Sequence, residues 1–98
     1  MIRIVSINKS HGYHADPHHA ISNLDWVNVE TGDRGRSTRL EVYEWIKNQN
    51  GKAYVTDKWG NKAFVGTREN MYGTKYLQTY TDRVWTDNLL ALPETVLK

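Results

Sequence analysis

The 98-residue sequence contains no cysteine, two prolines and a single phenylalanine, and it has no long apolar run. The absence of cysteine excludes disulfide bonds, thiolate zinc sites and cysteine nucleophiles. No segment approaches the ~20 apolar residues of a membrane-spanning helix, and the N-terminus is too short and too interrupted for a signal peptide. We therefore expect one domain, residues 1–98, in the cytoplasm and without a membrane partner.

Assembled catalytic motifs are also absent from the sequence. The four serines occupy no nucleophile elbow, and no pair of carboxylates has a spacing that fixes an acid and a base. Neither a phosphate-binding loop nor a dinucleotide glycine pattern is present. These observations predict a protein that is not an enzyme and that has no cofactor. The net charge of +2 is too small to indicate a class of partner.

Aromatic residues compensate for a modest apolar content. Hydrophobic residues make up 39% of the chain, and they include four tryptophans and six tyrosines. Each aromatic side chain can bury ~150–250 Å², so a chain of this length can still form a core. Tyr76 and Tyr80 would share one face of a strand by period-two alternation. That pattern is typical of a core face, although it would also suit a stacking platform.

Short β-branched and aromatic segments predict a mostly β domain. The clearest strands cover residues 2–7, 52–57, 62–68 and 75–81. The two middle strands nearly repeat one another, as Lys52-Ala53-Tyr54-Val55 and Lys62-Ala63-Phe64-Val65, and we expect them to form a hairpin. Residues 19–29 permit a short helix after Pro17 or a strand, and their alternation favours the strand. Loops are predicted at 8–18, 31–36 and 68–75.

One main helix is predicted over about residues 38–49. Thr38 and Glu41 match a capping box, in which each side chain accepts a hydrogen bond from the other residue's backbone. Asn50-Gly51 can end the helix in a left-handed conformation. The apolar face contains Leu40, Val42, Tyr43, Trp45 and Ile46. With a further helical turn at 87–92, the class is α+β, a small, mostly antiparallel sheet of four to five strands with one main helix packed on it.

The C-terminal region carries a recognisable motif. Leu77-x-Thr79, Asp82 and Asn88-Leu89-Leu90-x-Leu92-Pro93-Glu94 resemble the end of a family of small bacterial and phage proteins catalogued as a domain of unknown function. The Pro17-His18 pair, the helix and the following strand pair fall in the same order. Thr95 stands where that family often has cysteine, and the loop before the helix is richer in arginine. The resemblance implies a fold and a bacterial or phage setting, and it implies no activity.

The strongest candidate site is basic and aromatic. It consists of Arg34, Arg36, Arg39, Lys58, Trp59 and Lys62. The three arginines precede the helix, whose N-terminus offers free N–H groups and a partial positive charge, and guanidinium groups match phosphate oxygens in pairs. The indole would lie between two lysines at a hairpin tip, where it could stack on a base. The alternative is a solvated loop with its charges balanced and with Trp59 half-buried on the sheet.

All four histidines fall within nine residues, as His11, His14, His18 and His19. Imidazoles can hold zinc, nickel or copper when they converge. Pro17 interrupts the helical spacing between His14 and His18, so we predict no metal site and keep His14, His18 and His19 as weak candidates. A polar loop with exposed imidazoles is the simpler interpretation.

Three functions are compatible with these patterns. We favour a small binding module for nucleic acid or another phosphate-bearing ligand, through the basic and aromatic residues. The second is a protein-interaction module, or a self-associating one, through the apolar residues Leu89, Leu90, Leu92 and Leu97. The third is a metal-responsive domain built on the histidine loop.

Overall fold

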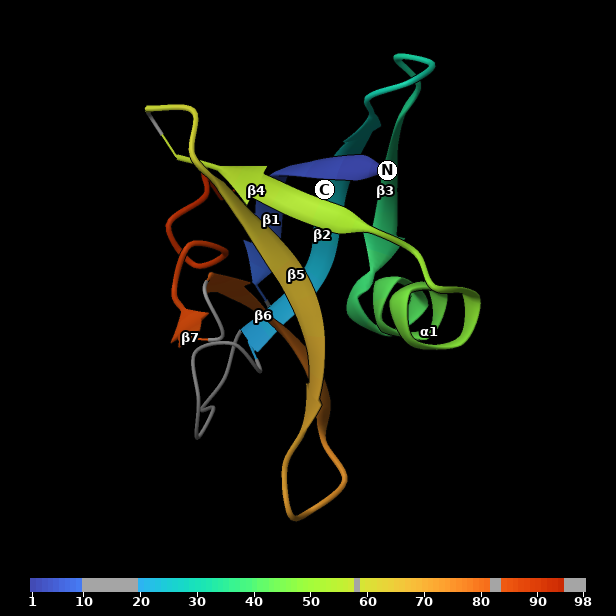
Figure 1. The fold of residues 1–98 in the computed structure, drawn as a ribbon. Helices are drawn as coiled ribbons and strands as arrows, with labels where there is room; N and C mark the ends of the chain where they lie inside the picture. Colours follow the sequence, from blue (N-terminus) through green and yellow to red (C-terminus); the bar gives the residue numbers. More distant parts are fainter. Residues whose placement is uncertain (10–19, 58, 82–83, 95–98) are drawn as a thin grey trace.

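The computed structural model describes residues 1–9, 20–57, 59–81 and 84–94, and within them seven strands form one sheet with one helix packed against it (Figure 1). The elements are β1 (Ile2–Lys9), β2 (Ile21–Asn28), β3 (Arg34–Thr38), α1 (Arg39–Gln49), β4 (Ala53–Thr56), β5 (Lys62–Glu69), β6 (Lys75–Thr81) and β7 (Val84–Thr86). The strand order is β3-β2-β1-β4-β5-β6-β7, and the β1–β4 pair is parallel while the other pairs are antiparallel. The expected α+β class is therefore confirmed.

The sheet is larger than the four to five strands that the sequence predicts. β3 occupies part of the turn expected at 31–36, and β7 follows the predicted strand at 75–81. These two strands form the edges of the sheet; β3 is polar throughout and β7 has three residues. Edge strands are often short or polar, because this discourages pairing with other chains. The same property removes the hydrophobic signal by which a strand is recognised in a sequence.

The structure also shows which conformations residues 19–29 and 87–92 adopt. Residues 21–28 form β2, so the strand interpretation of 19–29 is confirmed over the helix. Residues 88–91 form hydrogen-bonded turns, and the bond from Ala91 to Asp87 spans four residues, as in the single helical turn expected at 87–92. The N–H groups of Leu90 and Ala91 donate to the carbonyl of Asp87 at 3.0 and 3.3 Å. Pro93 follows at once and has no N–H with which to continue a helix.

Helix α1 begins and ends where its sequence indicates. Thr38 is the N-cap, and the predicted capping box with Glu41 is present in both directions. Asn50 ends the helix in a left-handed conformation at φ 54°. Val42 and Tyr43 are the buried residues of the helix. Leu40 was expected on this apolar face and is instead exposed, because it lies two residues before Val42 and so on nearly the opposite side of the helix.

The core lies between α1 and the inner face of the sheet. It includes Ile4, Leu24, Val55 and Leu77, which alternate along their strands with residues on the outer face. The chain after β7 returns to β1, where the N–H of Ile7 donates to the carbonyl of Pro93 at 3.0 Å. This return brings Leu89 to 0% exposure within the core. In the part of the chain described, no helix has the length and apolar character needed to cross a membrane.

Candidate functional site

One row of directly paired residues crosses all seven strands on the outer face of the sheet, opposite the core. Its members, from β3 to β7, are Arg34, Val27, Arg3, Tyr54, Phe64, Tyr80 and Trp85. Residues that pair directly project from the same face of a sheet. This outer row is therefore basic towards β3 and wholly aromatic from β4 to β7.

The aromatic half of the outer row is a chain of ring contacts. The ring centroids of Tyr54 and Phe64, and of Phe64 and Tyr80, are 6.4 Å apart, and those of Tyr80 and Trp85 are 5.7 Å apart in an edge-on arrangement. Tyr54 is buried, whereas Phe64, Tyr80 and Trp85 retain 38%, 39% and 42% exposure. Tilted and edge-on pairs of this kind add to the stability of the sheet. Three adjacent rings nevertheless present surface to solvent.

The indole of Trp85, the last ring of the outer row, packs against Gly66 of β5. A Cβ atom at this position would lie 3.0 Å from the indole of Trp85 and 3.2 Å from the ring of Tyr80. Any larger residue would therefore push both rings away from the sheet. The missing side chain allows the indole to pack directly over the strand backbone.

Two cationic side chains cover the aromatic rings from neighbouring positions. The Nζ of Lys62 lies 4.8 Å from the centroid of Tyr54, and the Cζ of Arg68 lies 4.6 Å from that of Trp85. Arg68 is also fixed by a hydrogen bond of 2.9 Å from its Nη1 to Oε1 of Gln78. These are cation–π geometries, and they place positive charge at both ends of the exposed rings.

The three predicted arginines are divided between two environments. Arg34 is exposed at the β3 end of the outer row, and Arg36 lies two residues further along the same face. The Nε of Arg36 donates to Oδ1 of Asp25 at 2.6 Å, and this hydrogen bond raises the pKa of Arg36. Arg39 is half-buried, and its Nη1 donates to the carbonyl of Ile21 at 3.4 Å. The prediction that the three arginines form a single cluster beside the helix N-terminus is therefore wrong.

The hairpin tip matches one part of the prediction. Trp59 is 76% exposed, so the half-buried alternative is wrong. The carboxylate of Asp57 organises the turn by accepting hydrogen bonds from the N–H groups of Trp59 and Asn61, both at 2.9 Å. Burial raises the pKa of Asp57, but the hydrogen bonds from Asn61, Trp59 and Gly60 outweigh this effect and lower it. Lys58 lies outside the described residues, and Lys62 joins the aromatic row.

The remaining predicted site residues either pack in or against the core or lie outside the residues that the structure describes. Leu89 is buried, and Leu90 and Leu92 pack against the core with part of their surface exposed. Leu97 falls outside the described ranges, as do His11, His14, His18 and His19. Among the residues with described positions, no three histidine or acidic side chains gather in a way that could hold a metal ion.

The sequence analysis assigned no function to most of the outer row. Arg3, Phe64 and Trp85 were not among the predicted site residues, and neither was Arg68, which lies against Trp85. Of the two tyrosines considered as a platform, Tyr80 belongs to the row. The repeated halves of the β4–β5 hairpin were the available signal, because they align Tyr54 with Phe64, and these two residues are direct partners.

Comparison with known proteins gives one match. A family model described as "Protein of unknown function (DUF3892)" matches residues 3–93. No curated protein and no solved structure matches the chain. The expected membership of a family catalogued as a domain of unknown function is thus confirmed. Over nearly its whole length, the chain belongs to the DUF3892 family, whose function is unknown.

Proposed function

We propose that this protein is a non-enzymatic module that binds single-stranded nucleic acid on the outer row. The observation that carries the proposal is the contact chain of three exposed rings, Phe64, Tyr80 and Trp85. Bases stack on aromatic side chains with little dependence on sequence, at ~1–3 kcal/mol per base. A sheet face with aromatic residues on adjacent strands is also the platform on which some RNA-binding domains stack two or three bases.

Cations near these rings provide contacts for the phosphates. Lys62 and Arg68 lie against the aromatic rings, and Arg3 continues the row next to Tyr54. Arg34 extends the positive charge to the sheet edge. A strand carries both phosphates and bases, so a surface on which cations adjoin a run of rings suits both parts of the ligand.

A single strand fits this surface better than a duplex does. The bases of a duplex are stacked on each other, and their faces are not available to the exposed rings. The protein also has a net charge of +2, which offers few contacts to the dense phosphates of double-stranded DNA. Stacking must therefore supply much of the affinity. The absence of cysteine suits a cytoplasmic protein of this kind.

Fluorescence anisotropy with labelled 12-nucleotide strands tests the proposal. We expect saturable binding of single-stranded RNA or DNA in the micromolar range, and weaker binding of the matching duplex. Absence of binding to any single strand at low salt, or preference for the duplex, would contradict it.

A protein partner is the second candidate function. Val84 is exposed beside Trp85 on the edge strand β7, and aromatic residues with arginine are common anchors of protein interfaces. Leu90 and Leu92 retain partial exposure, whereas the burial of Leu89 leaves it no direct role in a contact. Recovery of a stoichiometric protein partner, lost on Val84→Asp, together with no binding of oligonucleotides, would favour this function.

A further inference from the structure

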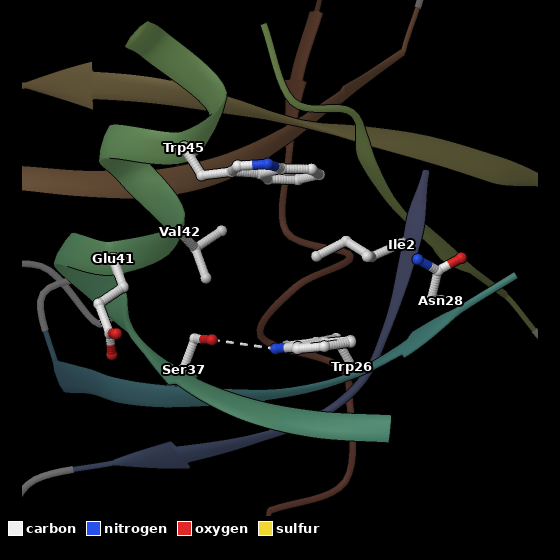
Figure 2. A pocket seen from close by; sticks show the side chains of 7 residues that line it. All are labelled: Ile2, Trp26, Asn28, Ser37, Glu41, Val42 and Trp45. Atoms are coloured by element: carbon white, nitrogen blue, oxygen red, sulfur yellow. Dashed lines mark hydrogen bonds between the residues drawn. The ribbon is translucent and has the colours of Figure 1, made fainter. Parts of the chain in front are cut away.

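A second aromatic feature lies on the opposite, helix-covered side of the sheet. A pocket of about 350 Å³ opens between α1 and strands β1 to β3 (Figure 2). Its lining consists of Ile2, Trp26, Asn28, Ser37, Glu41, Val42 and Trp45. The volume falls within the range of small-molecule sites, and a mostly apolar wall with a few polar groups is typical of them. We call this feature the indole pocket.

Two indoles form facing walls of the indole pocket. Figure 2 shows the ring of Trp45 on α1 and the ring of Trp26 on β2 across the open space from each other, both seen nearly edge-on. Ile2 and Val42 lie at the sides of the space between them. We call the space between the two aromatic faces the slot.

Each indole rests on a glycine, which fixes the direction of its free face. A Cβ atom at Gly35 would lie 2.4 Å from Cζ2 of Trp26, and one at Gly51 would lie 2.2 Å from Cδ2 of Trp45. No side chain other than hydrogen fits at either place. The Nε1–H of Trp26 also donates to Oγ of Ser37 at 3.0 Å. One face of each ring is therefore held against backbone, and the other is turned to the slot.

A polar side chain lies at each end of the slot, with Asn28 at one end and Glu41 at the other (Figure 2). The Oδ1 of Asn28 accepts hydrogen bonds from the N–H groups of Glu30 and Thr31 at 2.9 and 3.3 Å. This fixes the amide, and Figure 2 shows its nitrogen on the side of the pocket. Glu41 accepts the N–H of Thr38 at 2.8 Å, and a carboxylate has lone pairs for further donors. The pocket thus offers an amide donor and a carboxylate acceptor.

We propose that the indole pocket binds a planar nitrogen heteroaromatic ring of the nucleobase class, stacked between Trp26 and Trp45. Polar atoms on the rim of the ring would face Asn28 at one end of the pocket and Glu41 at the other. Two flat aromatic faces select a flat ligand, since stacking on both sides removes both of its faces from water. Donor and acceptor groups in one plane are what the edge of a base presents. The ring could belong to a free nucleoside or to one base of a longer strand.

This site is independent of the function proposed for the outer row, because the two lie on opposite faces of the sheet. A quaternary ammonium ion is the other ligand that tryptophans and a carboxylate can hold. It is better suited to a cage that surrounds a sphere than to a slot between two rings.

Two-dimensional ¹H–¹⁵N spectra of the indole Nε1–H groups test this inference, since the chain has four tryptophans. Adenosine, guanosine, cytidine and uridine would be titrated separately, followed by short oligonucleotides. We expect saturable shifts of Trp26 and Trp45 with at least one nucleoside or oligonucleotide. With nucleosides, Trp59 and Trp85 should remain unchanged. Shifts with free nucleosides identify a free ligand, and shifts with oligonucleotides alone identify a base of a strand.

Three variants separate the site from general effects. Gly51→Ala should displace the indole of Trp45 and weaken binding about tenfold, as expected for loss of one stacking face. Asn28→Asp keeps the acceptor that holds the turn but replaces the amide donor with a charge, so a similar loss is expected. Leu40→Ala, at an exposed position of α1 that does not line the pocket, is the control and should leave this binding unchanged.

The inference would be overturned by several results. These are no shift of Trp26 or Trp45 at millimolar nucleoside and with oligonucleotides, equal shifts of all four indoles, or equal losses in Gly51→Ala and Leu40→Ala. Binding of tetramethylammonium in preference to every nucleoside would also overturn it.

Discussion

On both faces of the sheet, tryptophan indoles pack against glycines, but the surfaces that result are different. On the outer face, the indole of Trp85 packs over Gly66 and stays open to solvent beside Tyr80 and Phe64. On the inner face, Trp26 and Trp45 pack over Gly35 and Gly51, and α1 closes the space between them.

The difference lies in what surrounds each indole. The outer indole has a guanidinium against its ring and other aromatic rings alongside, which suits a charged polymer that runs across the strands. The inner indoles have one another, two aliphatic side chains and a fixed amide, which suits one small flat group. An exposed row and an enclosed slot can therefore be probed separately in the same molecule.

The largest expected effect concerns the core that both faces share. Leu89 is fully buried, so Leu89→Ala should lower the free energy of unfolding by ~2–5 kcal/mol. Urea denaturation followed by circular dichroism measures the change. Leu40→Ala, at an exposed position, is the control and should have a much smaller effect. Equal losses in the two variants would mean that the C-terminal return to β1 does not anchor the core.

The next largest effect is expected for Gly66→Ala, which should weaken binding on the outer face only. The added Cβ atom meets Trp85 at 3.0 Å and Tyr80 at 3.2 Å, so both rings must shift. We expect roughly fivefold weaker binding of a single strand, or about 1 kcal/mol of stacking free energy. Anisotropy titration measures the loss. Unchanged oligonucleotide affinity in a folded variant would argue against stacking on these rings.

A smaller effect is expected for the basic part of the outer row. Arg3→Gln should reduce the slope of log affinity against log salt by ~0.7, the value for one phosphate contact to a single strand. Titrations at several salt concentrations measure the slope. Lys75→Gln is the matched control, because Lys75 pairs with Glu44 of α1 at 3.6 Å. Equal changes in the two variants would indicate an effect of net charge alone.

The smallest effect is a pH dependence confined to the helix-covered side. Hydrogen bonds from the backbone and side chain of Thr38 lower the pKa of Glu41 below its ordinary value of 4.5. The resulting stabilisation is present above that value and is lost as the pH falls through the lower folded-state pKa. A ¹³C titration of the Glu41 carboxylate measures it. A midpoint at or above 4.5 would contradict the capping geometry.

The sequence predicted the elements whose signal is local. The capping box of Thr38 and Glu41 located α1, and the repeated halves around Tyr54 and Phe64 located the β4–β5 hairpin. β3 and β7 were missed because short edge strands have little apolar alternation.

The outer row could not be read from the sequence, because it depends on the register of six strand pairs. Arg3 and Arg34 are far apart in the chain and are brought into one row by their common partner Val27. The indole pocket is hidden for the same reason. Its two tryptophans come from different elements, and the two glycines beneath them resemble ordinary turn or loop residues in the sequence.

The most direct test of the outer row is the affinity of Trp85→Ala for a labelled single strand, measured beside Tyr72→Ala. Both residues are exposed aromatics, but Tyr72 lies in the turn between β5 and β6 and outside the row. We predict that Trp85→Ala weakens binding roughly ten- to hundredfold, as loss of one stacked base requires, and that Tyr72→Ala leaves it unchanged. Equal affinities of the two variants, whether reduced or not, would contradict binding at the outer row.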